Sequence, residues 1–350
     1  MNLCSEVVMQ PGRVGAAKGP LRRRWPRAPA ARGAPRALLR AIAAAAGAAL
    51  SSLALAAPFA YITNQGSNDV SVIDLAERKV VATVPVGKAP AGIAVSFPTS
   101  RAFVSNPESK SVSVIDTASN QVVDTLPAGD GPVGIAVSPD GSRVWVADWF
   151  NNRVLVYDGS SHRALGTVPV GKAPAGIVVH PDGGRVYVAN RDSNSVSVID
   201  AGTLRVTREL PAGNHPFAVA LDPRGTRLYV VNVYSDDVSV VDTAGGTLIA
   251  TVPVGRSPYG AAVDADGKKV FVTNQHADSV SVIDARSHTL VATVPVGGYP
   301  EGIAVHGDRV YVVCWMDDSV AVMDARTFQV LETVDTGRNS RGFGQFIGAP

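Results

Sequence analysis

A unit of about 42 residues recurs along the 350-residue chain, and this repetition constrains the possible folds more than any other feature. One marker is an apolar segment with Asn, Asp or Cys at its end, and it occurs as YITN (Asn64), FVSN (Asn106), WVAD (Asp148), YVAN (Asn190), YVVN (Asn232), FVTN (Asn274) and YVVC (Cys314). A VSVID-like marker ends at Asp74, Asp116, Asp158, Asp200, Asp242, Asp284 and Asp324. A VPVG-like marker ends at Gly87, Gly129, Gly171, Gly213, Gly255, Gly297 and Gly337. Three markers in phase indicate seven copies of one structural unit.

Each copy predicts four short strands. A GIAV-like segment is the first, and a hairpin such as SPDGSR (138–143) joins it to the apolar segment of the first marker. Asp-Gly between apolar runs is a strong hairpin signal. The VSVID-like and TVPV-like segments are the third and fourth strands. Four strands in a period of about 40 to 45 residues are typical of propeller blades, so the sequence predicts an all-β, seven-bladed β-propeller.

The order of strands within a blade follows from proline and glycine. A proline falls in the TVPV-like strand of six copies, the first at Pro85 and the last at Pro295. Because proline cannot donate to a ladder, this strand is predicted to be the outer edge of the blade. The GIAV-like strand is small and Gly-rich, which suits the crowded wall of a central channel.

The two ends of the repeat region predict how the ring closes. Residues 59–64 read as a second strand with no first strand before it, and residues 342–348 read as a first strand with no second after it. We therefore expect the C-terminal segment to pair beside residues 61–64 and complete the seventh blade, leaving no open sheet edge in the ring. Residues 58–350 then form a single propeller domain.

Residues 1–57 read as a secretion signal. They hold nine of the Lys and Arg residues and one acid, and an apolar, Ala-rich stretch ends in Ala54-Leu55-Ala56, a small-x-small cleavage pattern. We expect removal near Ala56 and a periplasmic or secreted protein, with Sec or twin-arginine export both open. The apolar stretch is too short and Ala-rich for a stable membrane span.

The charge of the remaining chain limits the classes of partner. Residues 58–350 carry 23 basic and 29 acidic side chains, so the exported protein is acidic. Broad electrostatic affinity for nucleic acid or anionic membranes is therefore disfavoured. We expect a monomer.

The sequence lacks the common motifs of catalysis and cofactor attachment. It contains no CxxCH, CxxC, HExxH or GxSxG. After signal removal Cys314 is the one remaining cysteine, so no internal disulfide can form. We therefore expect no cofactor, no metal site and no catalytic residues, and predict that the protein is not an enzyme.

The recurring YVTN-like, VSVID and VPVG markers resemble the YVTN family of bacterial β-propeller repeats, and the resemblance covers residues 60–350. The WD dipeptide of WD40 blades is absent from the copies. The resemblance implies an exported seven-bladed propeller, and many members of the family have no assigned reaction.

Comparison of the copies separates structural from candidate functional residues. The repeated Asp, Asn and Gly residues of the markers serve a need that every blade shares, such as turn capping. The blade-to-blade loops and the loops after the YVTN-like strands diverge, and they share one face. Divergent loop residues predict a ligand-binding rim on that face: Trp149, Phe150, His215, Phe217, Tyr234, Tyr259, His276, Tyr299, Glu301 and Trp315. Basic residues are spread around the same rim: Lys88, Lys172, Arg191, Arg256, Arg338 and Arg341. The other interpretation is that some of the aromatic side chains turn inward and plug the channel.

The stretch VCWMDDSV (313–320) illustrates the comparison. Asp317 and Asp318 fall where another copy has Ala277 and Asp278, so the carboxylate pair is predicted to form a turn and not an acid/base pair. Cys314 replaces the repeated Asn and is predicted to be half-buried and unreactive.

Three functions remain open. The preferred hypothesis is a non-catalytic scaffold that binds a protein, peptide or polymer over the channel mouth. The first alternative is a metal-dependent, lactonase-like hydrolase, in which His215 and His276 would need Glu301 or an aspartate as a third metal ligand. The second alternative is a binder of an anionic chain such as single-stranded nucleic acid.

Overall fold

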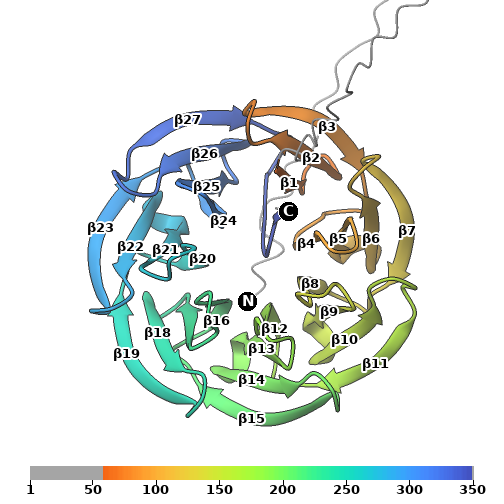
Figure 1. Cartoon of the computed structure of the whole chain (residues 1–350), viewed down its shortest axis with the longest axis horizontal. Helices are drawn as coiled ribbons and strands as arrows, with labels where there is room; N and C mark the ends of the chain where they lie inside the picture. The colour runs from red at the N-terminus through yellow and green to blue at the C-terminus, as the bar shows by residue number, and fades with distance from the viewer. Residues whose placement is uncertain (1–57, 349–350) are drawn as a thin grey trace, which may run out of the picture. The chain divides into compact units, whose positions relative to one another are not determined.

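The computed structural model describes residues 58–348, and these form seven four-stranded antiparallel sheets arranged as the blades of a ring (Figure 1). The predicted all-β, seven-bladed propeller is confirmed. The predicted secretion signal and its cleavage near Ala56 lie outside the described residues. We number the blades 1 to 7 along the chain, with β1, β2 and β3 in blade 1.

Each blade contributes one strand to each of four concentric layers. The strands nearest the channel are β28 (Ile347–Gly348), β4 (Ile93–Ser96), β8 (Pro132–Val137), β12 (Pro174–Val179), β16 (Pro216–Leu221), β20 (Pro258–Val263) and β24 (Pro300–His306). The second strands are β1 (Phe59–Asn64), β5 (Arg101–Asn106), β9 (Arg143–Asp148), β13 (Arg185–Asn190), β17 (Arg227–Asn232), β21 (Lys269–Asn274) and β25 (Arg309–Cys314). The third strands are β2 (Asp69–Asp74), β6 (Ser111–Asp116), β10 (Arg153–Asp158), β14 (Ser195–Asp200), β18 (Asp237–Asp242), β22 (Ser279–Asp284) and β26 (Ser319–Asp324). The outer strands are β3 (Lys79–Pro85), β7 (Gln121–Pro127), β11 (Ala164–Pro169), β15 (Arg205–Pro211), β19 (Thr247–Pro253), β23 (Thr289–Pro295) and β27 (Val330–Asp335).

Short 3-10 helices follow four of the second strands within residues 58–348. They are η1 (Pro107–Ser109), η2 (Trp149–Asn151), η3 (Arg191–Ser193) and η4 (Gln275–Ala277). The prolines of the TVPV-like segments end the outer strands, as predicted. Figure 1 shows these strands at the outer circumference of the ring. No helix within the described residues is both long and apolar enough to cross a bilayer.

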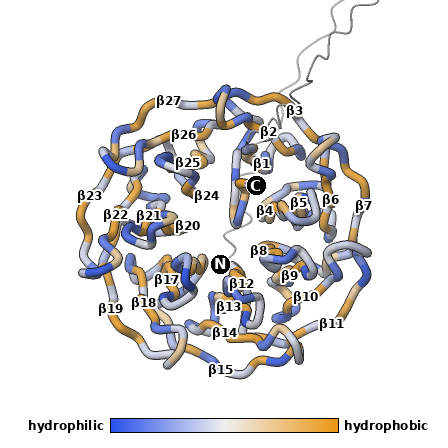
Figure 2. The backbone as a smooth tube through the Cα atoms, viewed as in Figure 1, coloured by the Kyte–Doolittle hydropathy of each residue, from blue (hydrophilic) through white to orange (hydrophobic). Residues whose placement is uncertain are grey.

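The hydrophobic core lies between neighbouring blades. The second and third strands are buried along most of their length, whereas the outer strands consist mostly of exposed and partly buried residues. The sequences of these buried strands, such as FAYITN and DVSVID, combine Val and Ile with small Ala and Ser residues. Figure 2 shows hydrophobic residues along the strands of every blade.

Glycine in the inner strands allows neighbouring blades to approach closely. A Cβ added at Gly134 would lie 1.9 Å from the carbonyl oxygen of Ala175 in the next blade. The same substitution at Gly260 would place a Cβ 2.4 Å from the carbonyl oxygen of Glu301. Only a residue without a side chain fits this approach, which explains why the inner strands are Gly-rich.

The repeated marker residues form structural contacts in the blades. Asn190 donates from Nδ2 to Ser197 Oγ (2.8 Å), and a Cβ on Gly171, the last residue of a VPVG-like marker, would lie 2.6 Å from Asn190 Cγ. Asp74, at the end of a VSVID-like strand, accepts the backbone N–H groups of Ala76 and Glu77. Asp74 therefore caps a turn, as the comparison of copies predicted, whereas Asn190 joins the second strand to the third.

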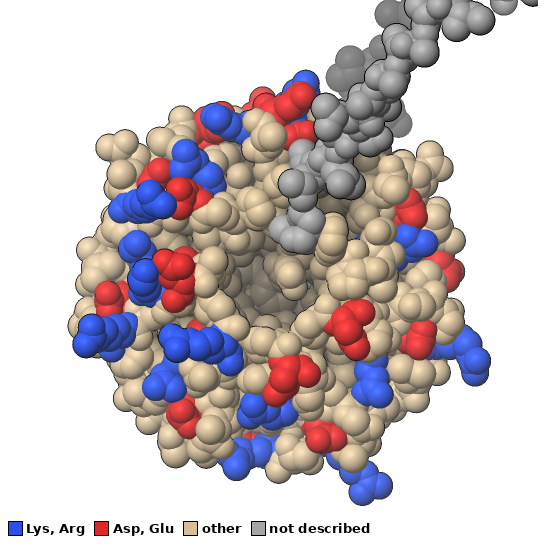
Figure 3. All heavy atoms as spheres, in the orientation of Figure 1, with Lys and Arg blue, Asp and Glu red and all other residues tan. Residues whose placement is uncertain are grey.

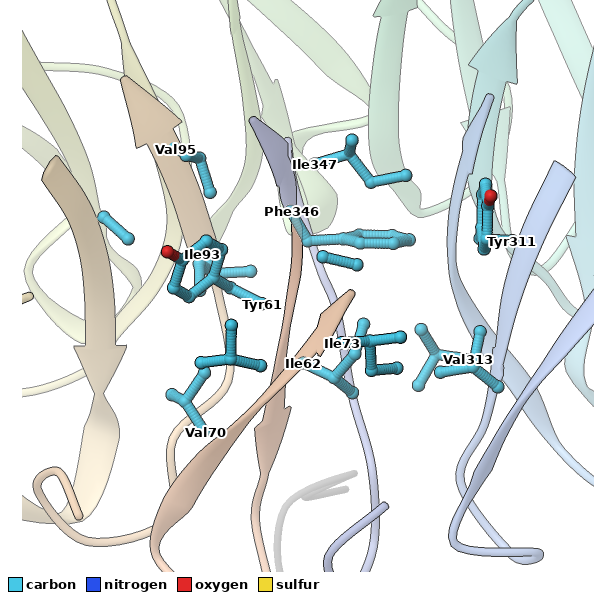
Figure 4. Close-up of a cluster of buried hydrophobic side chains, with 14 of the residues drawn as sticks. Tyr61, Ile62, Val70, Ile73, Ile93, Val95, Tyr311, Val313, Phe346 and Ile347 are labelled. Carbon is cyan, nitrogen blue, oxygen red and sulfur yellow. The ribbon is translucent and has the colours of Figure 1, made fainter. Parts of the chain in front are cut away.

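The C-terminal segment closes the ring on two sides. It pairs antiparallel with β1, with Gly348 opposite Phe59 and Ser340 opposite Asn64. On its other side, the carbonyl groups of Phe343 and Gln345 accept hydrogen bonds from β4 of blade 2. Phe346 is fully buried and points from this segment toward Tyr311 of blade 7 (Figure 4). The predicted closure is confirmed, and the segment also joins blade 1 to blade 2.

Candidate functional site

One face of the propeller collects the loops that diverge between copies, and we call it the rim face. The antiparallel register explains this, because five of the seven inner strands begin opposite the end of the second strand, as Pro132 does opposite Asp148. The third strand begins and the outer strand ends at the same edge, as shown by Arg153 opposite both Asp148 and Pro169. Side chains at these positions therefore surround one mouth of the channel.

Equivalent positions at the start of the inner strands form the innermost ring of this face. We call them the throat ring: Arg341, Ala91, Val133, Ala175, Phe217, Tyr259 and Glu301. Phe217 and Tyr259 are buried, with ring centroids 4.3 Å apart. Both pack on Phe343 of the C-terminal segment, at 5.0 and 5.7 Å. The structure thus places these two predicted rim residues inward, in an aromatic plug of the channel.

Glu301 is also turned inward and is paired with a cation. It is 1% exposed, and its Oε2 lies 3.1 Å from Nε of Arg341. Gln275 donates to its Oε1 at 3.0 Å, and Thr273 Oγ1 donates to its backbone carbonyl at 2.8 Å. Burial raises the pKa of Glu301, and the Arg341 guanidinium opposes that rise.

A second charged group lies over blade 4 and centres on Arg191. Its guanidinium carbon is 5.5 Å from the Trp149 ring centroid and 5.6 Å from that of Tyr234, which come from the two flanking blades. Nη1 lies 2.7 Å from Asp192 Oδ1, and Nη2 donates to the Tyr234 hydroxyl at 3.4 Å. Arg191 is 7% exposed, and its Nε is buried without a hydrogen-bond partner among residues 58–348.

His215 completes this group from the loop before β16. Its φ of +55° is left-handed, and Asn194 Oδ1 accepts its backbone N–H at 2.9 Å. Its ring centroid is 4.1 Å from that of Tyr234, and its Nε2 is 3.7 Å from Asp192 Oδ1. Burial and the neighbouring Arg191 guanidinium lower the pKa of His215 below its ordinary value, so the ring is neutral near pH 7. We call Trp149, Arg191, Asp192, His215 and Tyr234 the Arg191 cluster.

The remaining predicted rim residues form a separate row. His276, Tyr299 and Trp315 contact in sequence, with centroid distances of 5.4 and 5.7 Å. Trp315 Nε1 donates to Gln65 Oε1 at 3.3 Å. Phe150 is 63% exposed, and its ring covers Gly131. The ten predicted residues therefore do not form one site but divide among the plug, the Arg191 cluster, this row, the buried Glu301 and the exposed Phe150.

A metal site does not fit these side chains. Within the described residues no three His, Cys, Asp or Glu side chains are placed to hold a metal ion. Glu301 is occupied by Arg341 and Gln275, and His276 Nδ1 lies 2.7 Å from Ser257 Oγ. The proposed set of His215, His276 and Glu301 is therefore not assembled.

The polar residues of the stretch 313–320 have structural roles. Asp317 accepts the backbone N–H of Gly298, and Asp318 accepts that of Asn339. The prediction that Cys314 is half-buried is wrong, because the side chain is fully buried beneath Gly297. Burial raises the pKa of the Cys314 thiol to about 11, which makes it a poor nucleophile.

The face opposite the rim face opens into an uncharged channel. A cavity of about 770 Å³ is formed there by inner strands and by residues of the C-terminal segment, with mostly apolar side chains such as Val137, Val179 and Val263. Figure 3 shows a hollowed face with uncharged residues at its centre and charges on the surrounding blades. This cavity lacks the clustered polar groups of the rim face, so it is not the candidate catalytic site.

Three contributors to the rim face were missed by sequence reasoning. Phe343 stands where the other copies have an inner-strand Ile, Val or Ala, while Asp192 and Gln275 read as ordinary polar loop residues. Arg191 was one of six basic rim residues. Its distinguishing signal is that equivalent positions hold Gln, Pro, Trp or Val.

A family model described as "Lactonase, 7-bladed beta-propeller" matches residues 117–249, which is less than half of the chain. This range contains the whole Arg191 cluster. No curated protein matches the chain at a significant level.

Several solved structures share the fold. One is Kuenenia stuttgartiensis hydrazine synthase, with TM-score 0.70, 24% identity, and coverage of 76% of this chain and 92% of that one. A functionally unknown protein from Desulfotomaculum acetoxidans has TM-score 0.72, 17% identity, and coverage of 83% and 99%. The dihydro-heme d1 dehydrogenase NirN has TM-score 0.63, 17% identity, and coverage of 79% and 63%. At these identities the likeness concerns the fold alone.

The prediction of a non-catalytic binding scaffold for a protein, peptide or polymer is therefore wrong. The family model that matches the centre of the chain describes lactonases, which are enzymes, and two of the similar propellers are named as enzymes. The lactonase-like alternative agrees better with these matches than the scaffold does.

Proposed function

We propose that the protein is a lactonase-like hydrolase whose reaction takes place at the Arg191 cluster. One observation carries the proposal: a neutral histidine, a carboxylate and a buried guanidinium meet inside the 117–249 range that matches the lactonase model. Hydrolysis of a lactone requires a base for water and a cation for the oxyanion.

His215 is the proposed general base. Its lowered pKa keeps the imidazole unprotonated at neutral pH, so it can accept a proton from the attacking water through Nε2. The Asp192 carboxylate, 3.7 Å from that nitrogen, would stabilise the imidazolium that forms. The left-handed backbone at His215 and the hydrogen bond from Asn194 hold the ring at this position.

Arg191 is the proposed oxyanion partner. When water adds to the lactone carbonyl carbon, the carbonyl oxygen becomes an anion, and a nearby guanidinium stabilises it. Arg191 suits this task because Trp149, Asp192 and Tyr234 surround it, and a held cation needs little reorganisation. When the tetrahedral intermediate collapses, the ring C–O bond breaks. The ring oxygen then takes the proton from the His215 imidazolium. One water is consumed and one hydroxy acid is formed.

A panel of simple lactones, followed by release of acid at constant pH, tests the proposal. We expect hydrolysis by the purified protein, a loss of about 100-fold or more in His215→Gln, and a comparable loss in Arg191→Met. His276→Gln is the matched control, because it changes an exposed rim histidine outside the cluster and should retain activity. If no lactone is hydrolysed, or if the His276 variant loses as much activity as the His215 variant, the proposal fails.

We further propose that the chain is a YVTN-type propeller exported from the cytoplasm. The repeated markers and the basic, apolar leader support this. Mass spectrometry of the protein from cell fractions should find a periplasmic or secreted form that starts near residue 57 or 58. An intact leader on a cytoplasmic protein would contradict export.

A further inference from the structure

The cavity opposite the rim face has a continuous wall and an aromatic floor. Its volume of about 770 Å³ falls within the range of about 300–1,000 Å³ that is usual for small-molecule pockets. The inner strands of its wall come close enough at Gly134 and Gly260 to leave no room for a side chain between neighbouring blades. Phe343 lines the cavity, and Phe217 and Tyr259 pack on this residue. The aromatic plug therefore forms the floor of the cavity.

The wall of the cavity is uncharged. Among the described residues that line it there is no Lys, Arg, Asp or Glu, and His306 is the one titratable residue. The inner strands end around the cavity in residues such as Val137, Val179 and Val263. An ion that entered would lose its hydration without meeting a counter-charge, whereas an apolar body gains free energy by leaving water. The wall therefore favours a neutral ligand with an apolar body.

A neutral hydrogen-bonding group is also available beside the floor. Gln345 follows Phe343 in the C-terminal segment, lines the cavity and is exposed. Its backbone carbonyl accepts the N–H of Val95, but its side-chain amide has no hydrogen-bond partner among residues 58–348. A primary amide can both donate and accept, so it suits a hydroxyl, amine or amide group of a ligand.

We propose that this cavity is a second, non-catalytic site, which binds a neutral small molecule with an apolar body and one hydroxyl, amine or amide group. The apolar body lies against the aliphatic wall and Phe343, and the polar group forms a hydrogen bond with Gln345. Anions of the same size bind more weakly, because the lining offers no cation. The site does not depend on the proposed hydrolase, since the Arg191 cluster lies on the opposite face.

Competition among three naphthalenes tests the chemistry of the ligand. The probe is N-phenyl-1-naphthylamine, which is neutral and fluoresces strongly only in apolar surroundings, and we expect saturable binding of one probe per chain. The competitors are 1-naphthylmethanol, the anion 1-naphthoate and the purely apolar 1-methylnaphthalene. The alcohol should displace the probe at concentrations at least about tenfold lower than the anion. Absence of saturable binding, or equal displacement by the anion, overturns the proposal.

Lysine substitutions test whether the probe binds in the cavity. Val263→Lys places a cation in the wall, so the affinity of the alcohol divided by that of the anion should fall at least about tenfold. Val179→Lys does the same from another blade, and melting temperatures verify that the variants fold. Leu248→Lys is the matched control, because Leu248 is 53% exposed on an outer strand, and it should leave the ratio unchanged. A fall in the control, or in neither folded wall variant, overturns the proposal.

Gln345→Met tests the hydrogen bond at nearly constant side-chain size. The affinity of 1-naphthylmethanol divided by that of 1-methylnaphthalene should fall about threefold or more, because the hydroxyl loses its partner. Since Gln345 is exposed, its replacement should leave the melting temperature unchanged. An unchanged affinity ratio overturns the contact with Gln345.

Discussion

The carboxylate of Glu301 and the guanidinium of Arg341 lie 3.1 Å apart, although forty residues separate them in the chain. They join blade 7 to the segment that closes the ring. Arg341→Met leaves a buried carboxylate without its counter-charge, and we expect this to lower the free energy of unfolding by about 3–5 kcal/mol. Denaturant titration measures the loss. The double variant Glu301→Gln/Arg341→Met should recover most of it, and a double variant no more stable than the single one would contradict this account.

The carboxyl group of Glu301 also predicts how the free energy of unfolding depends on pH. Burial raises the pKa of Glu301 above its ordinary value of 4.5, so the folded protein holds this proton more tightly than the unfolded chain. A raised pKa contributes stability below the ordinary value and loses it as the pH rises through the folded-state pKa. The free energy of unfolding of the natural protein, minus that of Glu301→Gln, should therefore fall between pH 4 and pH 8. If this difference stays constant or rises over the range, the folded protein keeps Glu301 ionised beside Arg341, and the prediction is wrong.

A side chain at position 134 is expected to destabilise the contact between two neighbouring blades. A Cβ there would meet the backbone oxygen of Ala175 at 1.9 Å, so the two inner strands would have to separate. We expect Gly134→Ala to destabilise the fold by about 1–3 kcal/mol or more. Gly202→Ala is the control, because its added Cβ makes an ordinary contact at 3.4 Å. Equal melting temperatures for the two variants would refute the close-approach explanation.

Asn194 is expected to position the proposed base. Its Oδ1 holds the backbone N–H of His215, whereas the equivalent Asn152 holds that of Ala173 in a blade without a histidine there. Both asparagines have φ of +53°, so replacement by Ala carries the same backbone cost. Asn194→Ala should lower kcat for lactones by about tenfold. Asn152→Ala should lose similar stability but retain kcat, and equal kcat losses would argue against a positioning role.

Cys314 is expected to be inert in the folded protein. Its thiol is fully buried, and its pKa of about 11 leaves roughly one thiolate in a thousand at pH 8. Alkylation by iodoacetamide, followed by mass spectrometry, should be slower by more than about hundredfold in the native protein than in denaturant. Rapid labelling of the native protein would show that the thiol is accessible.

The fold was largely predictable because each blade repeats the same local signals. Proline at Pro85 placed the outer strand, and the unmatched segments at residues 59–64 and 342–348 located the closure. Each inference depended on residues close in sequence or on the count of copies.

The site was predictable only in part, because side-chain direction depends on distant residues. Phe217 and Tyr234 are both aromatic residues of the rim face. Phe217 nevertheless turns inward and packs on Phe343, which lies more than a hundred residues later in the sequence. Asp192 resembles an ordinary turn residue until the fold brings His215 to 3.7 Å from its carboxylate. Comparison of the copies indicated which positions diverge between blades, but not which of the divergent side chains contact one another.

The double attachment of the C-terminal segment has a consequence for the order of folding during synthesis. Blades 2 to 7 each consist of strands that are adjacent in sequence, so each can pair its strands soon after it leaves the ribosome. Blade 1 lacks its inner strand until residues 347–348 are made, and β4 likewise lacks its hydrogen bonds to Phe343 and Gln345. The nascent chain therefore carries two unsatisfied strand edges through almost the whole of its synthesis. These edges are the sites where a chaperone, or another nascent copy, would be expected to bind.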